Sequence, residues 1–189
     1  MSLTREAIIA AARDIMSAYG LADLSMRRLA AVLEVQPSAL YWHFAHKQNL
    51  LAAVARTILD DLPSGADGEW AAGDWAGWLR RWAARLHDLL RRQRGGAELV
   101  SSVLALQPWE AGPGAGLATG LTAAGWPPEP ARAGAAGLLH LVLGHTLDEE
   151  QRAQAHDLGV AAGPDPDSAA LLARSVNLLL AGLAAARPV

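Results

Sequence analysis

Residues 40–44 read LYWHF, and this short stretch decides how the N-terminal part of the chain is interpreted. On a helix, Leu40 and Phe44 lie four residues apart and share one face. Tyr41, Trp42 and His43 then point elsewhere around the helix, so three flat side chains with polar atoms leave the apolar side. The pattern predicts a short helix that is anchored by two apolar residues and presents its aromatic side chains outward.

The elements before this helix have the spacing of a helix-turn-helix. Thr4 is a candidate N-cap for a first helix that Gly20 ends, and Ser25 is a candidate N-cap for a second helix over 26–33. A three-residue connection leads to a third helix beginning at Pro37, where the missing N–H costs nothing. A tight connection before the last of three short helices predicts that this last helix enters the major groove of DNA.

The rest of the chain is also predicted to be helical, because Ala, Leu and Arg dominate and no stretch alternates in β-branched residues. We therefore expect an all-α fold with a helix-turn-helix DNA-binding domain over 1–46 and a helical effector-binding and dimerisation domain over 47–189. A helix over 47–62 is expected to link the two. Further helices are predicted at 74–94, 97–106, 114–124, 129–156 and 167–187.

Composition and charge exclude several classes. The chain has no cysteine, which excludes a disulfide scaffold and zinc-thiolate sites. Its net charge of -3 provides no global basic field, so any DNA contact must rely on a local patch. The start lacks the pattern of a signal peptide, and the apolar run over 133–147 is shorter than the about 20 residues that a bilayer requires. We expect a cytoplasmic protein with no membrane partner.

Small and basic residues near the third helix complete the predicted DNA-contacting set. Ser38 and Ala39 are small enough to approach base edges. Arg27 and Lys47 stand at helix starts, where side chains and backbone N–H groups together bind phosphates. The predicted DNA-binding residues are Arg27, Ser38, Ala39, Tyr41, Trp42, His43 and Lys47.

The segment LSMRRLAAVLEVQPSALYWHFAHKQNLL, residues 24–51, resembles the DNA-binding signature of the TetR family of transcriptional repressors. The resemblance covers about residues 4–62 and implies a dimeric, ligand-responsive regulator without a cofactor. Its DNA-contacting positions correspond to the basic and aromatic residues above. Glu34 replaces a glycine usual in the turn, so a left-handed backbone there would store roughly 1 kcal/mol of strain. Pro37 replaces a base-contacting glutamine, so the operator sequence should differ.

The expected effector follows from a contrast with the tetracycline-binding members of that family. Where they supply asparagine, histidine and threonine, this chain has Trp82, Val100 and Val103, which cannot ligate a metal-bound ligand. A tryptophan stripe at helical spacing is more often core, but it also suits a mostly apolar pocket. We expect a small, largely apolar effector with His87 or His140 as its hydrogen-bond partner. The predicted ligand-binding residues are Trp78, Trp82, Leu86, Val100, Val103, Leu104, Trp109, Leu117, Leu121 and His140.

The last two predicted helices have broad apolar faces interspersed with Ala and Gly, which favour close helix packing. Packing within one chain would bury them too, but two-fold symmetry suits a reader of palindromic DNA. We expect a homodimer. The predicted interface residues are Leu138, Leu139, Val142, Leu143, Leu171, Leu172, Val176 and Leu179.

Metal and enzyme signatures are weak. His145, Asp148 and Glu149 share one helix face and could hold a cation, but a solvent-exposed helix end beside acidic residues is the favoured interpretation, and no metal ligand is predicted. No G-x-S-x-G motif or dinucleotide fingerprint in its proper context is present, so an enzyme is the least favoured class.

The favoured function is a repressor that a small apolar effector releases from a palindromic operator. The alternative is a helical ligand-binding or adaptor dimer that has lost DNA binding, since residues 1–62 carry six basic and six acidic side chains.

Overall fold

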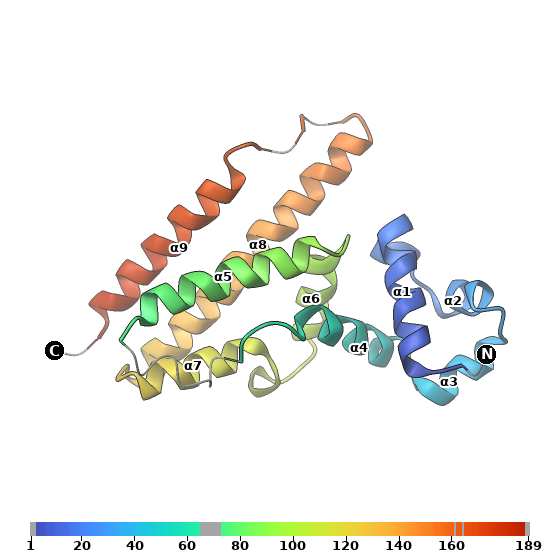
Figure 1. The fold of residues 1–189 in the computed structure, drawn as a ribbon, viewed down its shortest axis with the longest axis horizontal. Helices are drawn as coiled ribbons and strands as arrows, with labels where there is room; N and C mark the ends of the chain where they lie inside the picture. The colour runs from blue at the N-terminus through green and yellow to red at the C-terminus, as the bar shows by residue number, and fades with distance from the viewer. Residues whose placement is uncertain (1–2, 65–72, 161, 164, 188–189) are drawn as a thin grey trace. The chain divides into compact units, whose positions relative to one another are not determined.

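The structure, a computed structural model, describes residues 3–64, 73–160, 162–163 and 165–187. Throughout these ranges the chain forms helices and no strand, which confirms the predicted all-α class (Figure 1). The α-helices are α1 (Arg5–Tyr19), α2 (Met26–Val32), α3 (Pro37–His43), α4 (Lys47–Leu59), α5 (Trp75–Arg91), α6 (Gly96–Leu104), α7 (Pro113–Ala123), α8 (Pro128–Asp157) and α9 (Ser168–Ala185). Two 3₁₀ helices that the sequence did not predict are η1 (Leu21–Asp23) and η3 (Trp109–Ala111).

The helices form two compact units that do not follow the predicted boundary. The first unit combines Met1–Asp61 with Leu89–Ala105, and the second combines Leu62–Asp88 with Leu106–Val189. The sequence placed the division between residues 46 and 47. In the structure α4 packs against both α1 and α6, so α4 belongs to the first unit, whereas the sequence analysis assigned it to the second domain as a link.

The first unit is built on the apolar face of α1. Thr4 caps this helix, because its side-chain oxygen accepts a hydrogen bond from the N–H of Ala7 at 3.1 Å. Ile8, Ala12 and Ile15 are buried, as the helical spacing predicts, and α1 packs on α2 and α4. The three-helix arrangement expected from the sequence therefore forms, with α4 and α6 completing its core.

A buried amide joins α1 to the segment that follows α5. Gln93 is 3% exposed, and its Oε1 accepts a hydrogen bond from Arg13 Nε at 3.0 Å. Its Nε2 donates to the carbonyl of Arg13 at 3.2 Å and to the hydroxyl of Ser17 at 2.9 Å. Because buried polar groups are costly unless paired, these three bonds hold α1 in one register.

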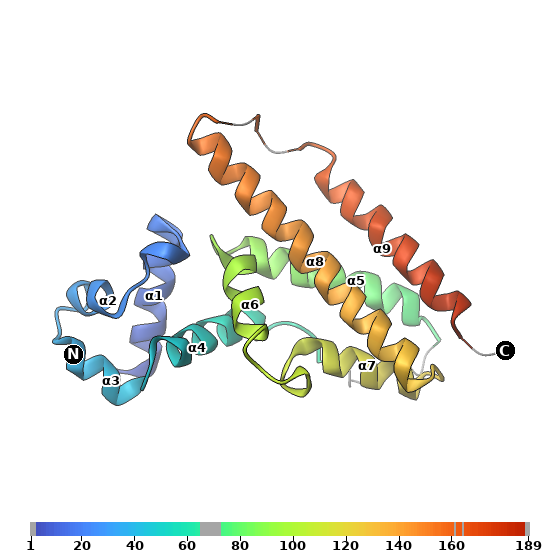
Figure 2. The same cartoon turned by 180° about the vertical axis from the view of Figure 1, so that it is seen from behind.

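In the second unit α8 lies beside α9, which runs in the opposite direction, and α8 also packs against α7 (Figure 2). Glycines allow the close approach of α8 to α9. A Cβ on Gly134 would lie 2.7 Å from Leu183 Cδ1, and a Cβ on Gly137 would lie 3.0 Å from Leu179 Cδ1. The small residues expected to permit close helix packing thus do so within one chain.

Tryptophans fill much of the second unit. Trp78 and Trp82 of α5 are buried, and Trp82 Nε1 donates to the carbonyl of Pro63 at 3.1 Å. Trp126 follows α7, donates from Nε1 to the carbonyl of Leu183 at 2.9 Å, and meets Trp75 edge to face with ring centroids 4.7 Å apart. With their indole N–H groups paired, Trp82 and Trp126 act as core residues.

The predicted dimer-interface residues are largely covered by the chain itself. Those on α8 are all buried, as are two of those on α9: Leu138, Leu139, Val142, Leu143, Leu172 and Val176. Leu179 is half-buried, and Leu171 is exposed. Because residues 133–147 of α8 and most of α9 are apolar or small, the sequence alone did not distinguish the inward face of these stretches from the outward one.

The outward face of α9 is unusually apolar. The stretch Ser168–Ala185 is long and apolar enough to cross a membrane by length and composition, with a mean hydropathy of 1.5. Only 22% of it is buried within the chain, and Leu178 is 76% exposed. The sequence analysis expected broad apolar faces on this helix and assigned them to a dimer interface.

Candidate nucleic-acid interface

Helix α3 has the geometry predicted from residues 40–44. Leu40 and Phe44 are fully buried, whereas Tyr41 is 50% exposed and Trp42 is 90% exposed. His43 is half-exposed at the end of the helix. Two apolar anchors four residues apart thus hold α3 on the core and direct the residues between them to the surface.

The turn before α3 ends α2 with a C-terminal capping motif whose central residue is strained. The N–H of Val35 donates to the carbonyl of Ala30 at 3.0 Å, and the N–H of Glu34 donates to the carbonyl of Ala31 at 3.2 Å. This pair of bonds is the Schellman arrangement, which places its central residue in the left-handed region and usually selects glycine. Glu34 adopts a φ of 54°, so the left-handed backbone predicted for this turn is present.

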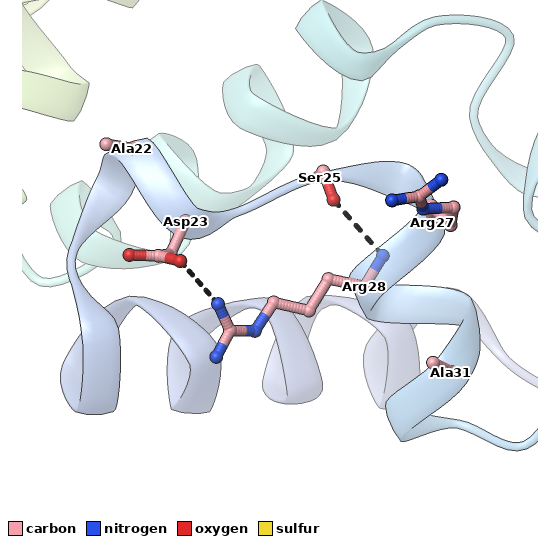
Figure 3. A pocket seen from close by; sticks show the side chains of 6 residues that line it. All are labelled: Ala22, Asp23, Ser25, Arg27, Arg28 and Ala31. Atoms are coloured by element: carbon pink, nitrogen blue, oxygen red, sulfur yellow. Dashed lines mark hydrogen bonds and ion pairs between the residues drawn. The ribbon is translucent and has the colours of Figure 1, made fainter.

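Arginines at the start of α2 border a hollow on the first unit. Its volume is about 430 Å³, and it is lined by Ala22, Asp23, Ser25, Arg27, Arg28 and Ala31 (Figure 3). Ser25 caps α2 by accepting the N–H of Arg28 at 3.1 Å. The Arg28 guanidinium turns back to Asp23 and stacks 3.8 Å from the Tyr19 ring centroid. Arg27 is exposed at the edge of the hollow, apart from the bond between Arg28 and Asp23, as an arginine that contacts phosphate requires.

The other predicted contact residues also lie at helix starts. Ser38 is exposed and Ala39 half-exposed in the first turn of α3, and Lys47 is the half-buried first residue of α4. Neither helix has a side-chain cap, since Gln36 and His46 make no such hydrogen bond. Uncapped N–H groups at helix starts are available to phosphate oxygens, which supports the assignment of these turns to the DNA backbone.

Arg5 is a positioning residue that the sequence did not reveal. Its guanidinium donates to the carbonyl of His43 at the end of α3 and lies 4.2 Å from the ring centroid of Phe44. Arg5 therefore fixes the end of α3 to α1. No motif indicated this role, because the His43 carbonyl is 38 residues away in the sequence and the Phe44 ring belongs to the next residue.

The predicted ligand-binding residues are divided between the two units. Val100, Val103 and Leu104 fall in the first unit, and the other seven residues fall in the second. In the second unit Trp78, Trp82 and Leu86 are buried on α5, as are Leu117 and Leu121 on α7, and Trp109 is half-buried. His140 is exposed on α8, and its role as a hydrogen-bond partner of the effector stays a prediction.

His87, the other candidate hydrogen-bond partner, lies 2.7 Å from Glu149 through its Nε2 atom. Glu149 was grouped with His145 and Asp148 in the sequence. Asp148 instead accepts a hydrogen bond from Arg152 Nε at 2.8 Å. The cluster around Glu149 therefore contains His87 and His145, and Asp148 is not part of it.

A recognition helix with outward aromatic side chains, held on a three-helix core and flanked by uncapped helix starts, defines a helix-turn-helix DNA-binding unit. Residues 8–54 match the sequence profile of the bacterial regulatory proteins of the tetR family. The chain is 31% identical to the class G tetracycline repressor of Vibrio anguillarum over 163 residues, which are 86% of this chain and 76% of that protein. The chain belongs to the tetR family, whose members are ligand-responsive DNA-binding regulators and not enzymes.

Solved structures agree with this assignment over nearly the whole chain. The crystal structure of Mycobacterium smegmatis BioQ matches with a TM-score of 0.85 and 37% identity, covering 97% of this chain and 99% of that one. BioQ with its double-stranded DNA operator matches with a TM-score of 0.73 and 34% identity over the same shares. Matches to some curated relatives are shorter: the chain spans 44% of the class C tetracycline repressor of Escherichia coli, at 36% identity over 102 residues, 51% of this chain.

Proposed function

We propose that this protein is a homodimeric, cytoplasmic repressor that binds a palindromic operator through α3 and leaves it when a small, largely apolar effector binds. It needs no cofactor and has no catalytic role. The observation that carries the proposal is the exposure of Trp42. Its side chain is 90% exposed, although Leu40 and Phe44, two residues before and after it, are fully buried. A large aromatic side chain fixed outward by its own helix is suited to contact a partner.

DNA binding is tested by fluorescence anisotropy with fragments of the DNA upstream of the protein's own gene, at several stated salt concentrations. Affinity should fall steeply with salt, because phosphate contacts release counterions. Arg27→Ala should weaken binding and lower the salt slope. Arg152→Ala, which removes an exposed positive charge from α8, is the charge-matched control and should leave the slope unchanged.

The alternative, an adaptor that has lost DNA binding, is favoured by one observation: the Arg28 guanidinium is engaged by Asp23 within the chain. That pairing reduces the local positive charge near α2. Upstream fragments that bind no better than unrelated DNA at every salt concentration would establish the alternative.

The proposed dimer uses the outward face of α8 and α9, which keeps the exposed Leu171 of the original prediction and leaves out the residues that the chain itself buries. Leu171 and Leu178 are seven residues apart on the exposed face of α9. Gly144 on α8 and Gly182 on α9 have no atom within 4 Å of a Cβ position. An exposed helical glycine costs about 1 kcal/mol relative to alanine, and close approach of a second copy would account for its use.

Light scattering tests this interface. Leu178→Glu should convert the dimer to a monomer at micromolar concentration, because the new carboxylate would be buried against the second copy. Leu158→Glu changes an equally exposed leucine at the end of α8 and should remain dimeric. A wild-type monomer would disprove the dimer.

The apolar effector is supported by the apolar interior of the second unit, where α5 buries tryptophans and leucines and α7 buries Leu117 and Leu121. A panel of aromatic and aliphatic compounds should raise the melting temperature and release the operator in the anisotropy assay. Compounds that bind without changing operator affinity would contradict the proposed release.

A further inference from the structure

Three side chains of the second unit converge on one point outside the nucleic-acid interface. His87 comes from α5, and His145 and Glu149 come from α8, where they lie one turn apart. His87 Nε2 is 2.7 Å from Glu149 Oε2, and His145 Nε2 is 3.5 Å from Glu149 Oε1. The side chains are 12%, 13% and 18% exposed in that order, so the cluster is largely shielded but reachable by a small ion.

The distances suit a metal ion. The ligand atoms of the three residues all lie within 4.8 Å of one another. A tetrahedral zinc ion with bonds of about 2.0–2.2 Å holds its ligand atoms roughly 3.3 Å apart, so small side-chain movements would complete the set. Both imidazoles offer the same kind of atom, Nε2, toward one carboxylate.

A fourth residue orients the carboxylate. Ser168, the first residue of α9, donates its hydroxyl to Glu149 Oε1 at 2.6 Å and lies 3.0 Å from His145 Nε2. A hydroxyl that binds one carboxylate oxygen fixes the orientation of the carboxylate beside the two imidazoles. In this arrangement Oε2 is the oxygen nearer His87.

We infer that His87, His145 and Glu149 form a binding site for a divalent transition-metal ion of the zinc class. Two imidazole nitrogens and one carboxylate are the donors that such ions prefer, whereas calcium and magnesium select oxygen donors. With both imidazoles neutral the three side chains carry one negative charge, which a divalent cation offsets. The fourth position remains for water.

The site joins helices that are distant in sequence. An ion held by His87 and by the pair on α8 connects α5 to α8, and Ser168 brings in the start of α9. Because an ion bound only by the folded form stabilises it, occupancy should raise the melting temperature of the protein. The inference requires neither DNA nor an effector, so its test is independent of the proposed function.

The test uses the full-length protein without an affinity tag, stripped with EDTA and dialysed against metal-free buffer. Calorimetric titration with Zn²⁺ should show one tight ion per chain. Co²⁺ should produce the visible absorption of a four-coordinate nitrogen and oxygen site. His87→Ala and Glu149→Gln should each weaken Zn²⁺ binding at least tenfold and remove the Co²⁺ band.

Two variants separate this site from ordinary surface binding. His140→Ala removes an exposed histidine from the same helix α8 and should leave affinity and stoichiometry unchanged. Ser168→Ala should weaken binding about tenfold, the usual cost of losing an orienting partner. Glu149→Gln preserves side-chain size, and circular dichroism verifies that each variant is folded.

Three results would overturn the inference: no Zn²⁺ binding tighter than millimolar, binding that survives both His87→Ala and Glu149→Gln, or equal loss in His140→Ala. A wild-type protein that gives no four-coordinate Co²⁺ spectrum would also contradict it, whatever the variants do.

Discussion

The aromatic residues of α3 and those of the second unit have opposite environments. Trp42 is 90% exposed on α3, whereas Trp82 is 1% exposed on α5. In α3 the aromatic side chains fall between the apolar anchors, and in α5 Trp78 and Trp82 fall on the buried stripe. The register of a residue relative to the apolar face, and not its type, therefore indicates whether an aromatic ring recognises a partner or fills a core.

The largest expected effect is the loss of stability when a buried tryptophan of α5 is removed. Trp82→Ala removes a fully buried indole and its hydrogen bond to the carbonyl of Pro63. We expect the free energy of unfolding to fall by about 3–5 kcal/mol, measured by urea denaturation. Trp42→Ala is the matched control and should change stability by no more than about 0.5 kcal/mol. Equal destabilisation by the two variants would break the comparison.

Removal of the exposed tryptophan of α3 should lower the affinity for DNA. Trp42→Ala should weaken operator binding about 30-fold, since each subunit of a dimer would lose a contact of about 1 kcal/mol. Anisotropy titration at constant salt measures the change, and Trp42→Phe should retain part of the affinity. Unchanged affinity in Trp42→Ala would show that α3 carries its tryptophan for another purpose.

A smaller effect on stability is expected at the left-handed residues that end one helix in each unit. Glu34 and Gly125 occupy the same place in two Schellman arrangements, with φ of 54° and 99°. Glu34→Gly should stabilise the protein by about 0.5–1 kcal/mol, because relief of left-handed strain exceeds the flexibility that glycine adds to the unfolded chain.

Two matched variants sharpen that prediction in thermal melts. Gly125→Ala should lower stability by about 1 kcal/mol, since it introduces in the second unit the strain that Glu34 already imposes on the first. Glu34→Ala retains the strained backbone and should give no gain. A gain from Glu34→Ala equal to that from Glu34→Gly would assign the effect to the charge instead of the backbone.

The smallest effect is a pH dependence in the second unit. Asp74 accepts the N–H of Gly77 at 2.9 Å and pairs with Arg81 at 3.3 Å, and these contacts lower the pKa of its carboxyl in the folded protein. A lowered folded-state pKa contributes stability that is present above the unfolded value of 3.8 and is lost as the pH falls through the folded value. Asp74→Asn should flatten that acidic part of the stability profile in urea melts. An identical profile would exclude Asp74 as its source.

The sequence predicted the helices well because caps and apolar spacing are local. Thr4 and Ser25 cap α1 and α2 as expected, whereas the left-handed turn at Glu34 was suggested by the family resemblance, in which a glycine is usual at this position. Features that depend on packing between remote helices were not predictable in this way. The meeting of His87 with Glu149 spans 62 residues, and no pattern within either helix indicated it.

The outward and inward faces of α8 and α9 escaped prediction for a different reason. Residues 133–147 of α8 are mostly apolar or small and have no continuous polar stripe to mark their solvent side, so Leu138 and Gly144 could not be told apart as core and surface. The contact of Arg5 with the end of α3 was equally hidden, because a lone arginine in a first turn has many possible partners.

The buried amide of Gln93 has a consequence for biosynthesis. Gln93 contributes to the core of the first unit through its bonds to Arg13 and Ser17, and the whole of α5 is translated between these partners. A nascent chain that has exposed only its first helices therefore lacks the contact that secures α1. The helix-turn-helix unit should therefore complete its folding late, although most of it is translated first. Ribosome-stalled chains that end before residue 93 should remain sensitive to protease.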